Sequence, residues 1–144
     1  MRFLTVIPLL LYPVLVYNVI AWAGTEFSTA EAVRRMMDME FKRVPMASGA
    51  DWVITRGAIL LTISLILLFF EMLKSARSDR YAVMNHAFSM LVFIVCLIEF
   101  LMFDAFATSV FFLIMLMTLL DIMAGFMVTI SAARRDFGGD GFAD

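Results

Sequence analysis

One aspartate lies in the middle of a long apolar segment. The segment is VFFLIMLMTLLDIMAGFMVTI, residues 110–130, and Asp121 is its only charged residue. A carboxylate at the centre of a bilayer costs at least about 2.5 kcal/mol unless it is neutral, paired or hydrated. The chemistry open to Asp121 is therefore the binding of a proton or a cation, or a hydrogen bond to a neighbouring helix.

The partners expected for Asp121 are two hydroxyl groups. At about 1.5 Å of rise per residue, Ser64 and Ser89 fall near the same depth in two other apolar segments. Without a cation at that level, burial favours the neutral, protonated form of the acid. Two interpretations remain open: a structural hydrogen bond between helices, or the ion- or proton-binding carboxylate of a small coupled transporter.

A second polar group is expected near one end of the apolar segments. Asn18, Arg56 and Glu99 each lie a few residues inside a segment boundary, at one common depth. An arginine and a glutamate buried together are far less costly than either alone. We therefore predict an Arg56–Glu99 ion pair with Asn18 beside it, as a structural clasp or, alternatively, as a transport site.

Glu71 and His86 form a third group, near the opposite end. They can meet as a pair, or they can extend to the aqueous interface along their own helices. The chain has one histidine and one cysteine, Cys96. Bis-histidine haem ligation within one chain, histidine-rich metal sites and CxxC redox chemistry are therefore excluded. A mixed carboxylate–histidine site at Glu71 and His86 is the weak remaining candidate, and we expect no metal and no cofactor.

The elements that position these residues are apolar segments of membrane-spanning length. The chain of 144 residues is 63% hydrophobic, against roughly 45–50% in soluble domains. A spanning helix needs about 20 apolar residues. Four segments meet this length, at residues 3–23, 52–73, 82–103 and 108–130, and they make one membrane domain over residues 1–133. The sequence thus predicts an all-α integral membrane protein with four transmembrane helices.

The first segment has two interpretations. Its basic start and its Ala21-Trp22-Ala23 end fit a signal peptide with an A-x-A cleavage site. Its near-spanning length favours an uncleaved first helix instead, with Trp22 as an interfacial anchor.

Residues 24–51 form the long connection to the second segment. Ser28-Thr29-Ala30-Glu31 fits a capping box, and apolar residues follow at helical spacing. We therefore expect a short amphipathic helix over residues 29–44, lying flat in the membrane interface. Asp51 is expected to cap the next helix.

Basic residues in the short connections predict the orientation. Residues 74–80 contain Lys74, Arg77 and Arg80, and the polar tail over residues 134–144 begins with two arginines. By the positive-inside rule, these segments and both termini face the cytoplasm. We expect a flexible tail and a location in a bacterial inner membrane.

The sequence indicates no catalytic motif. It contains no nucleophile elbow, P-loop or HExxH pattern, so we expect no enzyme activity. The net charge of −2 and the lack of a basic patch exclude nucleic acid as an expected partner. The favoured hypothesis is a non-enzymatic accessory, scaffold or assembly subunit that contacts lipid and other membrane-protein subunits or further copies of itself. The alternative is a small proton- or cation-coupled transporter or channel that uses Asp121.

Overall fold

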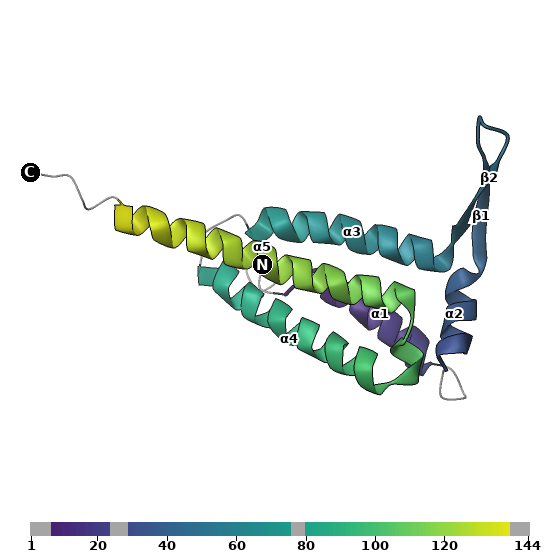
Figure 1. Cartoon of the computed structure of the whole chain (residues 1–144), viewed down its shortest axis with the longest axis horizontal. Helices are drawn as coiled ribbons and strands as arrows, with labels where there is room; N and C mark the ends of the chain where they lie inside the picture. The colour runs from purple at the N-terminus through teal and green to yellow at the C-terminus, as the bar shows by residue number, and fades with distance from the viewer. Residues whose placement is uncertain (1–6, 24–28, 76–79, 139–144) are drawn as a thin grey trace, which may run out of the picture.

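A bundle of helices makes up most of the protein, with one two-stranded ribbon at its end. The computed structural model describes residues 7–23, 29–75 and 80–138. In chain order the elements are α1 (Leu11–Trp22), α2 (Ala30–Asp38), β1 (Glu40–Pro45), β2 (Asp51–Thr55), α3 (Arg56–Ser75), α4 (Arg80–Met102), the 3₁₀ helix η2 (Asp104–Phe106) and α5 (Ser109–Gly138). Figure 1 shows α1, α3, α4 and α5 running along the bundle, with α2 and the ribbon at one end.

Three of these helices are long and apolar enough to cross a membrane. Their qualifying stretches are Arg56–Lys74, Met84–Met102 and Ser109–Met127. Their outward-facing leucine, isoleucine, phenylalanine and methionine side chains are largely exposed, as expected for helices whose solvent is lipid. The three stretches agree with the last three apolar segments of the sequence.

The fourth apolar helix is shorter than predicted. α1 has 12 residues, whereas the sequence predicts a span over residues 3–23. Residues 7–10 precede α1 as a bend and turn, and residues 3–6 lie outside the described part of the chain. Pro8 lies in this non-helical stretch, and a proline there favours a late start to the helix because it supplies no backbone N–H.

The segment predicted as the second half of an amphipathic helix is a strand. Residues 40–45 pair antiparallel with residues 51–55, and Val44 lies opposite Trp52. Gly49, with a φ of 84°, makes the turn between the strands. The prediction of helix is therefore wrong over residues 40–44 and 52–55. Asp51 lies in β2 and does not cap α3, which begins at Arg56.

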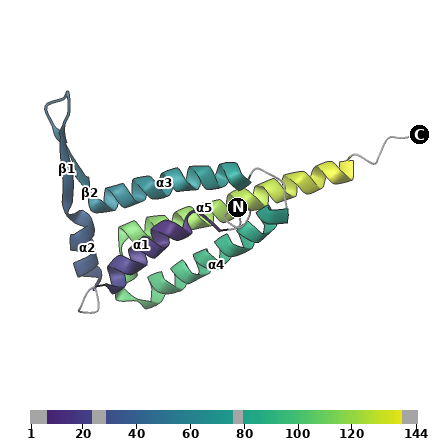
Figure 2. The ribbon, with the colours of Figure 1, turned by 180° about the vertical axis from the view of Figure 1, so that it is seen from behind.

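The remaining amphipathic helix, α2, lies across the end of the bundle (Figures 1 and 2). It ends at Asp38, six residues before the predicted end at residue 44. Thr29 is its N-cap and accepts a hydrogen bond from the backbone N–H of Ala32 at 3.3 Å. Its apolar face, Val33 and Met37, is buried against the protein. Tertiary packing thus uses the face that the sequence assigned to the membrane interface.

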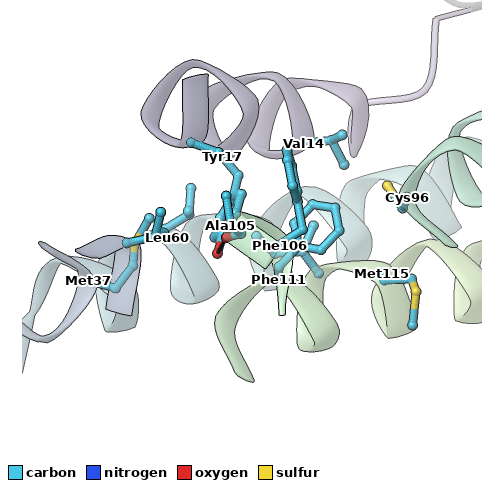
Figure 3. Close-up of a cluster of buried hydrophobic side chains, with 12 residues drawn as sticks. Val14, Tyr17, Met37, Leu60, Cys96, Ala105, Phe106, Phe111 and Met115 are labelled. Carbon is cyan, nitrogen blue, oxygen red and sulfur yellow. Dashed lines mark hydrogen bonds between the residues drawn. The ribbon is translucent and has the colours of Figure 1, made fainter. Parts of the chain in front are cut away.

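The buried apolar core lies at the ribbon end of the bundle. Figure 3 shows this cluster, in which Tyr17 extends from α1 toward Ala105 and Phe106. The ring of Tyr17 lies 4.8 Å from that of Phe111 and 5.6 Å from that of Phe106. Its hydroxyl is hydrogen-bonded to the Thr108 hydroxyl and donates to the Ala105 carbonyl at 3.3 Å. Aromatic packing and these bonds fix α1 against η2 and α5.

The last helix is longer than the sequence predicts. α5 runs to Gly138, whereas the sequence ends the span at residue 130 and places a flexible tail from residue 134. Figures 1 and 2 show the C-terminal turns of α5 extending beyond the ends of α3 and α4. The first five residues of the predicted tail are therefore helical, and residues 139–144 lie outside the described part of the chain.

Candidate functional site: a buried polar group between three helices

Polar side chains with almost no exposed surface gather where α3, α4 and α5 pack together. The largest sets of interhelix contacts join α5 to α3 and to α4. The buried polar residues on these three helices are Ser64, Glu71, Asn85, Ser89, Thr118 and Asp121. Polar groups in lipid-spanning helices are costly, so they turn inward and bond to each other. This interior is the candidate functional site.

Glu71 is the centre of a hydrogen-bond network at the end of the bundle away from the ribbon. Lys74 Nζ donates to Glu71 Oε1 at 3.0 Å, to Asn85 Oδ1 at 2.9 Å and to the backbone carbonyl of Ile7 at 3.0 Å. The amide of Asn85 also donates to Glu71 Oε1. Glu71 Oε2 accepts the backbone N–H of Leu9 at 2.7 Å. The charged pair thus bonds two polar groups of the chain before α1, and it joins α3 to α4.

This network changes the prediction made for Glu71 and His86. Glu71 is buried and does not extend to the interface, and its described hydrogen bonds go to Lys74, Asn85 and Leu9. The sequence pattern predicts Lys74 only as one of the basic residues of the connection over residues 74–80. Its spacing of three residues from Glu71 was the signal for an ion pair on one helix face.

Asp121 is fully buried and bonded to α4. The Ser89 hydroxyl lies 2.6 Å from Asp121 Oδ2, so the predicted Ser89–Asp121 contact is confirmed. Asp121 Oδ1 is also buried and has no hydrogen-bond partner among the described residues. Ser64, the other predicted partner, donates to the Leu60 carbonyl of its own helix at 2.7 Å. One carboxyl oxygen of Asp121 therefore accepts a hydrogen bond, and the other has no hydrogen-bond partner among the described residues.

His86 of α4 lies against Gly125, which is one helix turn from Asp121 on α5. A Cβ atom built on Gly125 would fall 1.4 Å from His86 Cε1 and 1.8 Å from Nε2. The imidazole therefore occupies the space that any larger residue at position 125 would need. The absence of a side chain at Gly125 lets α4 and α5 approach closely with a histidine between them.

The third predicted cluster is only partly formed. Asn18 Nδ2 donates to Glu99 Oε2 at 3.2 Å, which joins α1 to α4 as expected. Arg56 lies elsewhere: it is the first residue of α3, its side chain is exposed, and its backbone N–H donates to the Met39 carbonyl. No ion pair among the described residues joins Arg56 to Glu99. The prediction of that pair is wrong because residues 51–55 are a strand, which places Arg56 at the helix start.

The ribbon carries exposed apolar side chains next to its own ion pairs. Phe41 is 67% exposed and Trp52 is 57% exposed. Arg43 bonds Glu40 at 2.8 Å and Asp51 at 3.4 Å. The hydrogen bond from Arg43 holds the pKa of Glu40 below its usual range. The charges of the ribbon are thus largely satisfied within it, whereas its aromatic side chains are not covered.

Within the described residues no three histidine, cysteine, aspartate or glutamate side chains come close enough to hold a metal ion. Comparisons with protein-family models, with curated proteins and with solved structures found no match.

Proposed function

We propose that this protein is a small inner-membrane accessory, scaffold or assembly subunit that contacts another membrane-protein subunit or a further copy of itself. The observation that carries the proposal is the ribbon, β1 and β2, which extends away from the helices with Phe41 and Trp52 exposed. An isolated two-stranded ribbon is marginally stable in water, and exposed apolar patches mark contact sites. A partner surface over the ribbon would supply the missing burial.

The buried polar group supports a non-enzymatic role. Most of its polar atoms bond within the protein: Ser64 and Thr118 bond carbonyls of their own helices. Glu71 bonds Lys74, Asn85 and the chain before α1. A group whose bonds are already made between helices acts first as a clasp, because few of its donors and acceptors are left for a substrate.

We further propose four crossings of the membrane with both termini in the cytoplasm. Supporting this, Ile7 and Leu9 bond Lys74 and Glu71 at one end of the bundle. Trp22, at the end of α1, contacts Phe103 edge to face at the other end, with ring centroids 5.4 Å apart. The stretch from residue 7 to residue 22 thus extends between both ends, although only part of it is helical. Reporter fusions at residues 46 and 77 test the proposal, since it places them on opposite sides.

Site-specific photo-crosslinking tests the accessory role. A photoreactive residue in place of Trp52 should give a protein adduct of one discrete mass in intact membranes. The matched control is Leu101, which is 69% exposed on α4 and should yield lipid adducts. Lipid adducts alone at both positions would contradict the proposed protein contact.

A second candidate function is proton or cation coupling at Asp121. The observation in its favour is the bare Oδ1 atom of a fully buried carboxyl group. Asp121→Asn keeps the shape and a hydrogen-bonding group but cannot gain or lose a proton. Under this candidate, a pH-driven flux in proteoliposomes is lost in Asp121→Asn while assembly is intact; a wild-type protein without flux would dismiss it.

A further inference from the structure

The polar side chains around Asp121 are not distributed evenly along the bundle. Toward the end away from the ribbon, α4 carries Ser89 and, about one turn further along, the adjacent residues His86 and Asn85, and Asn85 bonds Glu71 and Lys74. The Lys74 side chain is 23% exposed. Polar side chains of α4 therefore lie between the level of Asp121 and a lysine at the surface.

Toward the ribbon the surroundings of Asp121 are apolar. The buried side chains on α5 in that direction are Thr118, Met115, Ile114 and Phe111, and Cys96 lies on α4. The Thr118 hydroxyl donates to the Met115 carbonyl of its own helix at 2.6 Å, so this hydrogen bond does not link Asp121 to another polar side chain. A proton has polar groups to follow on one side of Asp121 and a packed core on the other.

The geometry at Asp121 fits an acid that carries a proton. An ionised carboxylate has two acceptor oxygens, and a bare charged oxygen in a dry interior is very costly. A neutral acid needs less: its carbonyl oxygen accepts from the Ser89 hydroxyl, and an unbonded O–H costs far less than a bare charge. The single 2.6 Å contact to Ser89 and the bare Oδ1 match the neutral form.

The lysine among the charged neighbours of Asp121 is already paired with Glu71. Among the described side chains, those whose charge acts on Asp121 are Glu71 and Lys74 on α3 and His86 on α4. Lys74 bonds Glu71, so the pair is close to neutral as a unit. The titratable group that α1 buries, Tyr17, bonds Thr108 in the ribbon-end core.

We propose that Asp121 is a one-sided proton-binding site: it holds a proton at neutral pH and exchanges it only through the end of the bundle at Lys74. The proposal goes beyond the accessory role and does not depend on it. It also separates this chain from a coupled transporter, which must expose its site to both sides of the membrane in turn. The site is suited to sensing the proton concentration on the Lys74 side.

Selective labelling tests the protonation state. The full chain is reconstituted in lipid with ¹³C in the aspartate carboxyl groups alone, so that Glu71 and Glu99 give no signal. One carboxyl resonance should keep the chemical shift of a neutral acid at pH 7 and be missing from Asp121→Asn. A carboxylate shift for every aspartate at pH 7 would overturn the proposal.

Two matched variants test the direction of access. Asn85→Leu removes a polar group on the Lys74 side, and Thr118→Val removes one on the ribbon side. We expect hydrogen exchange at the Asp121 carboxyl group to slow at least tenfold in Asn85→Leu and to stay unchanged in Thr118→Val. If Asn85→Leu does not assemble, His86→Phe takes its place. Slowing by Thr118→Val, or a proton flux across the liposome that Asp121→Asn abolishes, would refute one-sided access.

Discussion

Gly125 and His86 permit a sharp test of how α4 and α5 pack. A methyl group at position 125 would lie 1.4 Å, 1.8 Å and 2.2 Å from three ring atoms of His86. Carbon atoms pack at about 3.5–4.0 Å, so the imidazole would have to retreat by about 2 Å. Because three atoms of the imidazole ring are this close, turning the ring about its bond to Cβ cannot remove the clash. Overpacking of this kind costs about 1–3 kcal/mol, and we expect that loss for Gly125→Ala.

The double variant isolates the contact. In a His86→Ala background the space is empty, so Gly125→Ala should cost less than about 0.5 kcal/mol and can gain from the helix propensity of alanine. The coupling energy between the two substitutions should then be about 1–3 kcal/mol. The assay is reversible unfolding in mixed micelles, followed by helical circular dichroism.

A second glycine supplies the control. A Cβ on Gly57 would lie 3.0 Å from Val110 Cγ2 and 3.3 Å from Met37 Cβ, so Gly57→Ala should cost less and should be indifferent to His86→Ala. An equal cost for Gly125→Ala in the wild-type and His86→Ala backgrounds would refute the reasoning.

Three further substitutions test the polar contacts by the same unfolding assay. Lys74→Gln leaves Glu71 buried without its cation and should reduce the free energy of unfolding by about 2–4 kcal/mol. This is somewhat less than for a fully buried pair, because Lys74 is partly exposed. Adding Glu71→Gln should recover part of the loss, and additive losses would rule out direct pairing. Arg56→Gln should change the free energy of unfolding by less than about 0.5 kcal/mol, because the Arg56 side chain is exposed. A large loss would instead support the ion pair with Glu99 that the sequence predicts. Ser89→Ala removes the bond to Asp121 and should cost about 0.6–1.7 kcal/mol, the range for hydrogen bonds between membrane helices, and no loss would deny the bond a structural role.

The sequence predicts the long helices and several of their polar contacts because these depend on length and depth. An apolar run of about 20 residues has few alternatives to a helix. Depth along a helix is fixed by a constant rise, so Ser89 and Asp121, and likewise Asn18 and Glu99, could be matched from residue counts alone. Both contacts join residues that lie inside the observed helices as well as inside the predicted ones.

The errors arise where a short segment has two possible structures. Apolar residues at 41 and 44 fit a helical face, and they also fit a strand opposite the aromatic and β-branched residues 52–54. The Ser48-Gly49 turn was the available signal for the strand pair. Interpreting that turn as a connection between two helices moves the predicted start of α3 by four residues and places Arg56 in the interior. The direction in which Lys74 extends depends on tertiary packing, which residue counting does not include.

The hydrogen bond from Leu9 to Glu71 has a consequence for biogenesis. The acceptor is synthesised 62 residues after the donor, which at about 5–20 residues per second is about 3–12 s later. During that interval, the backbone before α1 lacks the partner that an apolar environment requires. We therefore expect the first segment to stay beside the insertion machinery until α3 and α4 are in the membrane. Crosslinking of arrested nascent chains measures this, and release of the first segment from chains that end before residue 71 would contradict it. We therefore expect α1, the first helix to be synthesised, to be the last to pack into the bundle.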